Sequence, residues 1–286
     1  MPVKKLLLNA NGYPASLREL AQPPKQLFVQ SDNWEDLMSR PHVAIIGSRK
    51  VSAYGRAVTS KFASELAAQG VVIVSGLALG VDGLAHQAAL DVGGLTMAVL
   101  PTGLDRIYPA SHRNLAQKIV EQGGALLTEY EDGANVYKTN FVARNRIVAG
   151  LSSAVLITEA ALKSGSLHTA RFALEQGIDV LAVPGNINSA TSIGTNNPIK
   201  SGAIPVTDIE DILHVIGLTS SQPLPKITSA NPDEQLLLDL LRQGTTDGAE
   251  LHLASQLSIE TFNHTLTMLE ITGQIRPLGA NQWSLS

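Results

Sequence analysis

"IIGSRKVSAYGR", residues 45–56, joins the end of a continuously apolar run to the start of a stretch with helical periodicity. A strand-to-helix junction of this kind is typical of α/β proteins, and it is where they hold phosphate groups. The stretch therefore predicts an α/β fold with a phosphate site. It leaves open whether the phosphate belongs to a nucleotide cofactor, to a substrate that is cleaved, or to the backbone of a nucleic acid.

The same pattern repeats along the chain. Short apolar runs occupy residues 43–47, 71–76, 96–103, 125–130, 154–159 and 180–185. Stretches with helical periodicity, most of them ending in glycine, alternate with them at residues 54–70, 80–94, 111–124 and 166–177. Apolar runs without alternation are typical of parallel strands that are buried on both faces. The sequence therefore predicts a doubly wound, mostly parallel α/β sheet.

Composition changes mark the expected domain boundaries. Residues 1–40 are proline-rich but apolar, which favours a strap packed on the main domain, residues 41–217. Residues 218–231 form a Ser/Thr/Pro-rich linker, and residues 232–286 have the pattern of three short helices followed by a two-stranded wing. This order is that of a winged-helix domain.

The composition limits the function classes. The chain has 286 residues, 44% of them hydrophobic, and no cysteine, so that disulfides and thiolate metal sites are excluded. No signal peptide or membrane span is apparent, and we expect a cytoplasmic protein. The net charge is −4, and residues 230–286 carry two basic against seven acidic residues. Any basic surface must therefore arise from clustering in the first domain.

The first candidate site is the opening loop, with Gly47, Ser48, Arg49 and Lys50. It lacks the G-x-G-x-x-G of a dinucleotide site and the Gly-Lys-Ser/Thr of a P-loop. A glycine that allows close approach, helix-start N–H groups and a planar guanidinium suit a phosphate. The alternative is an ordinary turn with an exposed Arg-Lys pair.

The second candidate is "YKTNFVARNRIVAGL", whose candidate residues are Lys138, Phe141, Arg144, Asn145 and Arg146. Cations interleaved with an aromatic ring suit single-stranded nucleic acid, because cations follow the phosphates while the ring stacks on a base. Alternatively Phe141 belongs to the core and an arginine pairs with Glu129 or Glu159.

The third candidate combines small polar residues at other expected strand and helix ends: Ser75, Gly76, Ser164, Gly165, Ser166 and Thr169. Ser166 can equally be a helix N-cap. Asp82 and His86, four residues apart, allow an acid–base pair, although a structural hydrogen bond is the commoner role of such a pair.

Catalytic and metal chemistry have little support in the sequence. The seven histidines include no i, i+4 pair, and no G-x-S-x-G elbow is present. Glu129 and Glu159 remain as carboxylates near strand ends, where they can serve catalysis or anchor an arginine. No pattern demands a cofactor or a metal ion.

Several motifs in one order carry a family resemblance: "GSRKVSAYG", "VSGLALGVDGLAHQAAL", "AVLPTGLDRIYP", "FVARNRIVAGLS", "SGSLHTARFALEQG" and "VLAVPGNI". They resemble the DprA/Smf family, the DNA-processing proteins of natural transformation, over residues 13–212. The acidic helical tail resembles the winged-helix module of that family.

The resemblance implies an extended Rossmann-like domain that binds and protects single-stranded DNA, usually as a homodimer, and helps to load the recombinase RecA in homologous recombination. It implies binding without hydrolysis. It also implies that Arg49 and Lys138 contact phosphates and that Phe141 stacks on a base. Many members carry an N-terminal sterile-alpha-motif-like domain, for which about forty residues are too few.

Two further hypotheses follow. The expected third helix of the tail, within residues 258–275, has no Lys or Arg, which disfavours a duplex-reading role and favours protein contact or the support of a dimer. The alternative to a single-strand binder is a Rossmann-like nucleotide hydrolase of the phosphoribohydrolase type. Such enzymes carry Pro-Gly-Gly-x-Gly-Thr-x-x-Glu, whereas "SGSLHTARFALEQ" lacks the double glycine and the correctly spaced acid.

Overall fold

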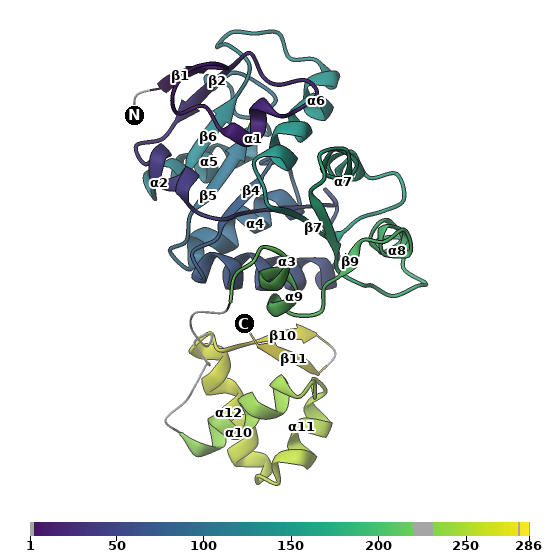
Figure 1. Cartoon of the computed structure of the whole chain (residues 1–286). Coiled ribbons are helices and arrows are strands. Elements are labelled where there is room, and N and C mark those ends of the chain that lie inside the picture. The colour runs from purple at the N-terminus through teal and green to yellow at the C-terminus, as the bar shows by residue number, and fades with distance from the viewer. Residues whose placement is uncertain (1–2, 220–230, 280, 286) are drawn as a thin grey trace. The chain divides into compact units, whose positions relative to one another are not determined.

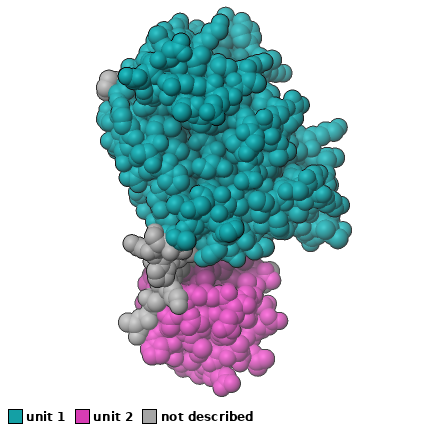
Figure 2. Space-filling model, viewed as in Figure 1, with its two compact units in different colours: residues 1–222 teal, residues 223–286 magenta. Residues whose placement is uncertain are grey.

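The structure, a computed structural model, describes residues 3–219, 231–279 and 281–285. The chain divides into two compact units, residues 1–222 and 223–286, coloured teal and magenta in Figure 2. The predicted linker, residues 218–231, lies almost entirely outside the described residues. Within those described ranges, no helix combines the length and the apolarity needed to cross a membrane.

A nine-stranded sheet forms the centre of the first unit (Figure 1). Its strands, in spatial order, are β1 (Val3–Leu7), β2 (Gln26–Gln30), β6 (Ala125–Thr128), β5 (Thr96–Val99), β4 (Val72–Ser75), β3 (His42–Gly47), β7 (Ala154–Glu159), β8 (Asp179–Ala182) and β9 (Ile204–Pro205). The strands from β6 to β9 are parallel to one another, and β1 and β2 are antiparallel to their neighbours. The predicted mostly parallel sheet is confirmed, including all six predicted strands.

Helices cover both faces of this sheet. The helices that follow β3 are α3 (Ala53–Ala68), α4 (Val81–Asp91), the 3-10 turn η1 (Ala110–His112), α5 (Arg113–Glu121), α6 (Lys138–Gly150), α7 (Ser166–Glu175), α8 (Ile193–Lys200) and α9 (Ile209–Val215). Met97 and Val99 pack with residues of α6 and α7, while Ala98 packs with residues of α5. Because successive strand residues point to opposite faces, α6 and α7 lie on one face and α5 on the other. This is the predicted doubly wound arrangement.

The N-terminal segment contributes more than a strap. Besides β1 and β2 it contains two short helices, α1 (Ala15–Arg18) and α2 (Trp34–Ser39). Leu27 and Val29 of β2 and Trp34 are buried in the same core cluster as α6 and α7, and the indole of Trp34 donates to the Gly12 carbonyl at 3.0 Å. The segment therefore extends the sheet by two antiparallel strands, which the proline-rich sequence did not predict.

The order of the strands reverses at β3. The chain builds outward from β3 through β4 and β5 to β6, and then returns to place β7 on the other side of β3. In open α/β sheets, ligands bind beyond the carboxyl ends of the strands at such a switch point. The topology therefore directs attention to the loops after β3 and β7.

The second unit consists of three helices and a hairpin: α10 (Pro232–Arg242), α11 (Gly248–Ser255), α12 (Ile259–Ile271), β10 (Ile275–Gly279) and β11 (Gln282–Leu285). Asn231, Asp247 and Ser258 cap the three helices with their side chains. The hydrophobic core of this unit consists of leucines together with Phe262 and Ile275. The predicted winged-helix order is confirmed.

Candidate functional site

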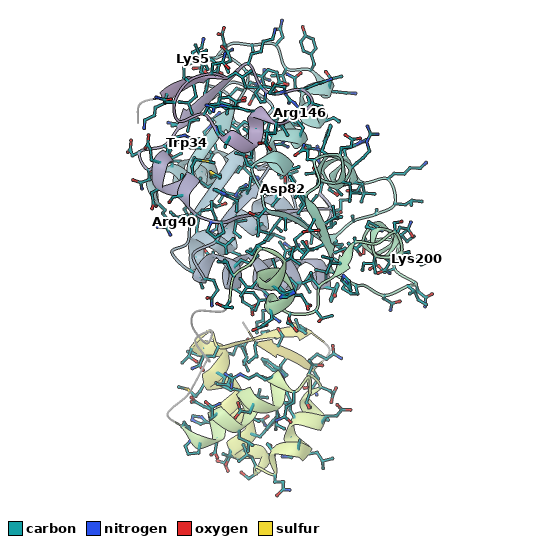
Figure 3. All side chains as sticks on the ribbon, viewed as in Figure 1. Lys5, Trp34, Arg40, Asp82, Arg146 and Lys200 are labelled. Carbon is teal, nitrogen blue, oxygen red and sulfur yellow. The ribbon has the colours of Figure 1, made fainter. Side chains whose placement is uncertain are left out.

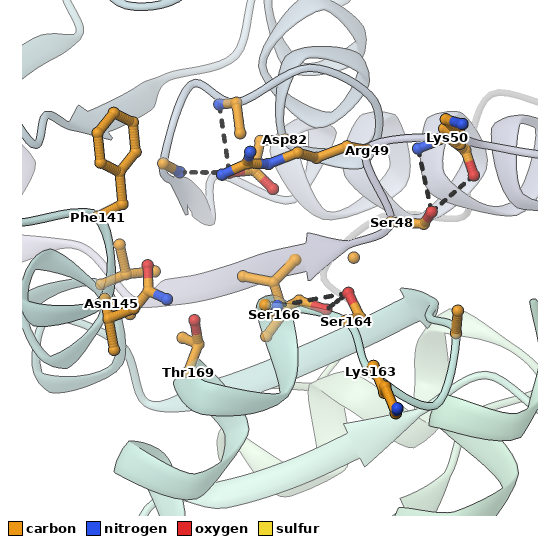
Figure 4. Close-up of a pocket in the computed structure, with 18 of the residues that line it drawn as sticks. Ser48, Arg49, Lys50, Asp82, Phe141, Asn145, Lys163, Ser164, Ser166 and Thr169 are labelled. Carbon is orange, nitrogen blue, oxygen red and sulfur yellow. Dashed lines mark hydrogen bonds between the residues drawn. The ribbon is translucent and has the colours of Figure 1, made fainter. Parts of the chain in front are cut away.

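A cleft of about 580 Å³ opens at the switch point, between the loops that follow β3 and β7 (Figure 4). It contains twelve of the fifteen residues that the sequence predicts for the site: Gly47, Ser48, Arg49, Lys50, Gly76, Phe141, Arg144, Asn145, Ser164, Gly165, Ser166 and Thr169. The three candidate segments, far apart in the sequence, therefore meet at one place. Ser75, Lys138 and Arg146 are not among the residues that line this cleft.

The loop after β3 forms one wall of the cleft. At Gly47 the backbone is closely packed, because a Cβ there would lie 2.6 Å from the Glu159 carbonyl oxygen. The Ser48 N–H donates to that same carbonyl at 2.7 Å, and the Ser48 hydroxyl donates to the Lys50 carbonyl at 2.6 Å. These bonds fix the backbone of the turn and leave the side chains of Arg49 and Lys50 exposed.

Glu159, one of the two carboxylates considered for catalysis, supports this loop. Its side chain is 2% exposed, and Oε2 accepts the Ser52 N–H at 2.9 Å. Ser52 is the N-cap of α3 and accepts the Gly55 N–H at 3.0 Å. The carboxylate thus lies at the N-terminus of α3, where a negative charge is stabilised by the helix dipole. Its position indicates a structural role.

The cleft carries exposed positive charge on both sides. Arg49 and Lys50 lie on the β3 loop, and Lys163 lies on the β7 loop opposite them (Figure 4). In the part of the chain that the structure describes, none of these three cations forms an ion pair. Lys163 directly precedes the predicted site residue Ser164 but is not itself among the predicted site residues. Unpaired, solvent-exposed cations are available to an anionic ligand.

Helix α6 forms a second wall. Phe141, Asn145 and Val148 line the cleft, and the spacing of 3–4 residues places them on one helical face. Lys138 lies one turn before Phe141 on that face and is exposed, so it extends the cationic surface beyond the cleft. The ring of Phe141 is half-buried and contacts Tyr108 edge-on, with ring centroids 5.0 Å apart. Part of Phe141 therefore remains available to a ligand.

Arg144 forms the floor of the cleft and is only 4% exposed. Its guanidinium donates to the carbonyl of Gly76, at 2.6 Å, and to that of Val99. A Cβ on Gly76 would overlap the guanidinium, so a side chain at this position would displace Arg144 from its present place. Burial, more than any other cause, lowers the pKa of Arg144 to about 10, which leaves it charged at neutral pH. The buried cation supports the cleft from below.

The loop between β4 and α4 is held by three polar side chains, those of Arg144, Asp82 and His112. Asp82 accepts the N–H groups of Gly76, at 3.1 Å, and Ala78, at 3.4 Å. Between them Leu77 adopts a φ of +58° while fully buried, a conformation rare for a residue with a Cβ. Its carbonyl oxygen lies 2.9 Å from Nδ1 of His112. The loop under the cleft is therefore fixed from several directions.

Asp82 and His86 do not act as an acid–base pair in this arrangement. Nδ1 of His86 lies 2.6 Å from the Thr96 hydroxyl, whereas Asp82 bonds the backbone of the β4–α4 loop. Burial, followed by the charges of His112 and Arg144, lowers the pKa of His86 to about 3, so that it is neutral at physiological pH. The bonds around both residues are structural.

The start of α7 forms the remaining wall. The hydroxyls of Ser164 and Ser166 lie 2.7 Å apart, and Thr169 is buried at the base of the wall. Gly165, not Ser166, is the N-cap residue of the helix, and because glycine has no side chain it makes no capping hydrogen bond. Hydroxyl groups at this helix end therefore face the cationic loop across the cleft (Figure 4).

Ser75 and Arg146 lie outside the cleft for clear reasons. The Ser75 hydroxyl is buried in the sheet and donates to the Ile45 carbonyl at 2.7 Å. Arg146 follows Arg144 by two residues and so points to another side of α6. It makes a bidentate pair with Glu129, at 2.6 and 2.7 Å, and donates to the Gln22 carbonyl at 2.9 Å, close to the N-terminal segment (Figure 3). Arg146 therefore lies outside this cleft, and its pairing with Glu129 is the alternative that the sequence leaves open.

Arg146→Ala should therefore act on stability and not on ligand binding. The pair is largely buried, with side-chain exposures of 14% and 18%. Loss of charge-assisted bonds of this kind should cost about 1.5–3 kcal/mol in the free energy of unfolding, measured with urea. The control is Arg171→Ala, because the Arg171–Glu175 pair is exposed and should be worth about 0.5 kcal/mol or less. A stable Arg146→Ala protein with weakened ligand binding would contradict this assignment.

Comparison with known proteins agrees with this architecture. The family model described as DNA recombination-mediator protein A matches residues 4–217, and the DprA winged helix domain matches residues 221–281. The chain is 45% identical over 225 residues to the protein Smf of Escherichia coli, covering 78% of this chain and 60% of that protein. It is 43% identical to the DNA processing protein DprA of Streptococcus pneumoniae, over 70% of each chain. The chain thus spans about three fifths of the length of the Escherichia coli relative.

Two solved structures are similar in fold and sequence. One is the X-ray structure of DprA from Streptococcus pneumoniae, with a TM-score of 0.68 and 39% identity over 74% of this chain and 73% of that one. The other is a structure of DNA processing protein A from Helicobacter pylori, which is described as giving insight into the single-stranded DNA binding mode of that protein. It has a TM-score of 0.67 and 38% identity over 75% of this chain and 95% of that one. With these matches, the chain belongs to the DprA/Smf family of DNA recombination-mediator proteins and carries the winged-helix domain of that family.

Proposed function

We propose that this chain binds single-stranded DNA in the cleft at the β3–β7 switch point. The observation that carries the proposal is the set of exposed cations on two loops of the cleft, Arg49 and Lys50 on one and Lys163 on the other. None of them forms an ion pair with a described residue, and the half-buried ring of Phe141 lines the same cleft. Cations that follow phosphates beside a ring that stacks on a base are the common elements of single-strand binding. The Helicobacter pylori relative is described as a single-stranded DNA binder.

A polymer fits the distribution of charge better than a mononucleotide. A single phosphate needs one cationic loop, whereas cations here lie on the β3 loop, on the β7 loop and, through Lys138, at the start of α6. Ser164 and Ser166 add hydroxyl donors between them. Because these groups are placed to contact the phosphate backbone of a DNA strand, we expect an affinity that depends little on the DNA sequence and falls as the salt concentration rises.

Binding without catalysis is part of the proposal. Asp82 and Glu159, the carboxylates nearest to the cleft, already accept backbone N–H groups, and His86 is buried and neutral. We propose a recombination mediator that protects single-stranded DNA and helps to load a RecA-type recombinase, acting as a homodimer. The family description as a recombination mediator supports this role.

The winged-helix domain is proposed to contact protein. Its third helix, α12, contains no Lys or Arg, and the domain is acidic overall. A duplex-reading helix needs cations for the phosphates. A basic surface on a recombinase or on a second copy of the chain is the complementary partner.

Binding of fluorescent oligo-dT and of the matching duplex, at several salt concentrations, tests the proposal. We expect salt-sensitive binding that favours the single strand. Arg49→Ala should weaken binding and reduce the slope of log K against log salt by about 0.7, the value for one phosphate contact on a single strand. Arg171→Ala, which removes an exposed arginine outside the cleft, is the matched control and should leave the slope unchanged.

Two outcomes would change the assignment. If the folded parent protein binds no oligo-dT at low salt, the single-strand proposal fails. Release of free base from nucleoside monophosphates at turnover rates would instead favour a nucleotide hydrolase.

A further inference from the structure

A second, smaller hollow continues from the cleft beyond Phe141. Its volume is about 50 Å³, and it shares Arg49, Gly76, Ala78, Phe141 and Arg144 with the main cleft. Its outer rim is formed by Leu79, Pro101, Tyr108 and Pro109. The surface that carries the proposed DNA site is therefore continuous past Phe141 and becomes apolar there.

Tyr108 and Leu79 are both exposed on this rim, with exposed fractions of 47% and 48%. The main cleft, in contrast, is edged by cations and hydroxyls. Apolar side chains beside a charged cleft cannot bind phosphates, but they suit the faces of nucleobases, which are flat and poorly hydrated. The change in chemistry along the surface indicates a change in the part of the nucleotide that is bound.

Tyr108 differs from Tyr54, a tyrosine with a structural role, in the hydrogen bonding of its hydroxyl. Tyr54 is similarly exposed, at 50%, but its hydroxyl donates to the Pro184 carbonyl at 2.7 Å. The Tyr108 hydroxyl has no hydrogen-bond partner among the residues that the structure describes. The ring of Tyr108 is positioned by its contact with Phe141 and not by its polar end.

We infer that Tyr108, with Leu79 beside it, forms a second base subsite next to Phe141. This inference rests on the proposed binding of single-stranded DNA. The hollow is smaller than a nucleobase, so the base lies across its mouth, against the exposed part of the Tyr108 ring. Arg49 borders both the cleft and the hollow and is placed to contact the phosphate between the two nucleotides.

The geometry of the two rings sets the shape of the bound strand. The planes of Tyr108 and Phe141 differ by 80°. Bases that stack on the two rings are therefore nearly perpendicular to each other, whereas two bases that stack on each other in a free single strand are parallel. Binding therefore turns the strand at that point and separates any stacked pair of bases that occupies the two subsites.

Single and double variants test the subsite by affinity. Tyr108→Ala should weaken the binding of short oligo-dT by about 5- to 150-fold, the range for loss of one base–aromatic stack, with no change in the salt slope. Tyr108→Phe retains the ring and should restore affinity, and Leu79→Gln should weaken binding without altering Phe141. Because Tyr108 and Phe141 touch, the double variant with Phe141→Ala should show coupling. Leu174→Ala, at an exposed apolar residue of α7 outside the cleft, is the control.

Circular dichroism tests the turn of the strand. A pair of adjacent 2-aminopurines in oligo-dT gives an exciton couplet while the two bases stack in parallel. We expect the couplet to be lost when the parent protein binds and to persist when Tyr108→Ala binds at saturating concentration. Lys118→Ala, at an exposed lysine of α5, should behave as the parent does.

The outcomes separate this subsite from the underlying proposal. If Arg49→Ala loses affinity while Tyr108→Ala binds as the parent does and the couplet persists on the parent, the subsite is refuted and the single-strand site stands. If the parent binds no oligo-dT, both fail. A loss of affinity that Tyr108→Phe does not restore would also refute stacking.

Discussion

Replacing Arg144 by methionine is expected to destabilise the first unit by about 3–5 kcal/mol, the cost of removing one partner from a buried pair of charges. The guanidinium is 4% exposed, lies near the buried carboxylate of Asp82 and donates to two backbone carbonyls. Methionine fills similar volume but leaves these groups without a cation. Urea unfolding followed through Trp34, in a Trp283→Phe background, measures the loss, because Trp34 is buried in this unit.

The loss in the free energy of unfolding caused by Arg144→Met, its stability deficit, should depend on pH. Burial raises the pKa of Asp82 above its ordinary value, and the charge of Arg144 opposes that rise. Without Arg144 the pKa in the folded state rises further, while the unfolded chain keeps its ordinary pKa of about 4. An acid whose pKa is raised on folding contributes stability below its unfolded pKa and loses it as the pH rises through the folded pKa. The deficit should therefore be largest near pH 7 and shrink as the pH falls towards 4.

A double variant provides the control for this interpretation. Asp82→Asn removes the charge and keeps an oxygen that can accept an N–H group of the β4–α4 loop. The double variant Asp82→Asn/Arg144→Met should lose less free energy of unfolding than the two single variants lose together, because neither buried charge is then left without its partner. Additive effects with no pH dependence would show that Arg144 stabilises the unit through its backbone bonds alone.

The second large effect is expected from removing the three exposed cations of the cleft together. Arg49→Ala, Lys50→Ala and Lys163→Ala in one protein should lower the salt slope by about 2 and the affinity for oligo-dT by about 100-fold at 0.1 M salt. The three side chains form no ion pair in the described ranges, so the fold should be retained. Because the lost term is counterion release, the affinities of variant and parent should converge near 1 M salt.

The matched control removes three exposed cations elsewhere in the same unit: Lys118, Arg171 and Lys200. It changes the net charge of the protein equally. If it lowers affinity as much as the cleft variant does, the effect is one of overall charge and the cleft is not the binding surface. If neither variant changes the slope, the phosphate contacts lie beyond the cleft, with Lys138 as the first residue to test.

The central strands could be predicted because each is buried on both faces. Runs such as residues 43–47 and 154–159 have no alternation, which is typical of strands in a parallel sheet that is covered on both faces. The loops that follow parallel strands share one edge, so the meeting of the three candidate segments was predictable too. The two antiparallel strands were not predicted, because β1 contains Lys4 and Lys5 and prolines precede β2. Their pairing depends on contacts between segments that are distant in the sequence.

Individual site residues were less predictable because orientation on a helix decides their role. Arg144 and Arg146 are separated by one residue in the sequence, yet one lies under the cleft and the other pairs with Glu129. Without the register of α6 the two arginines are equivalent candidates. Lys163 was missed because it stands in a loop, where no periodicity marks the direction of a side chain.

The fixed loop between β4 and α4 affects how much conformational entropy the protein and the bound nucleic acid each lose on binding. Asp82, His112 and Arg144 hold the backbone of residues 76–78 through bonds within the protein, and Leu77 in this segment has an unusual φ of +58°. A floor that is preorganised in this way has little conformational freedom left to lose when a ligand arrives. The cost of ordering therefore falls on the flexible strand, and a nucleic acid already bent at one step will bind better than a relaxed one.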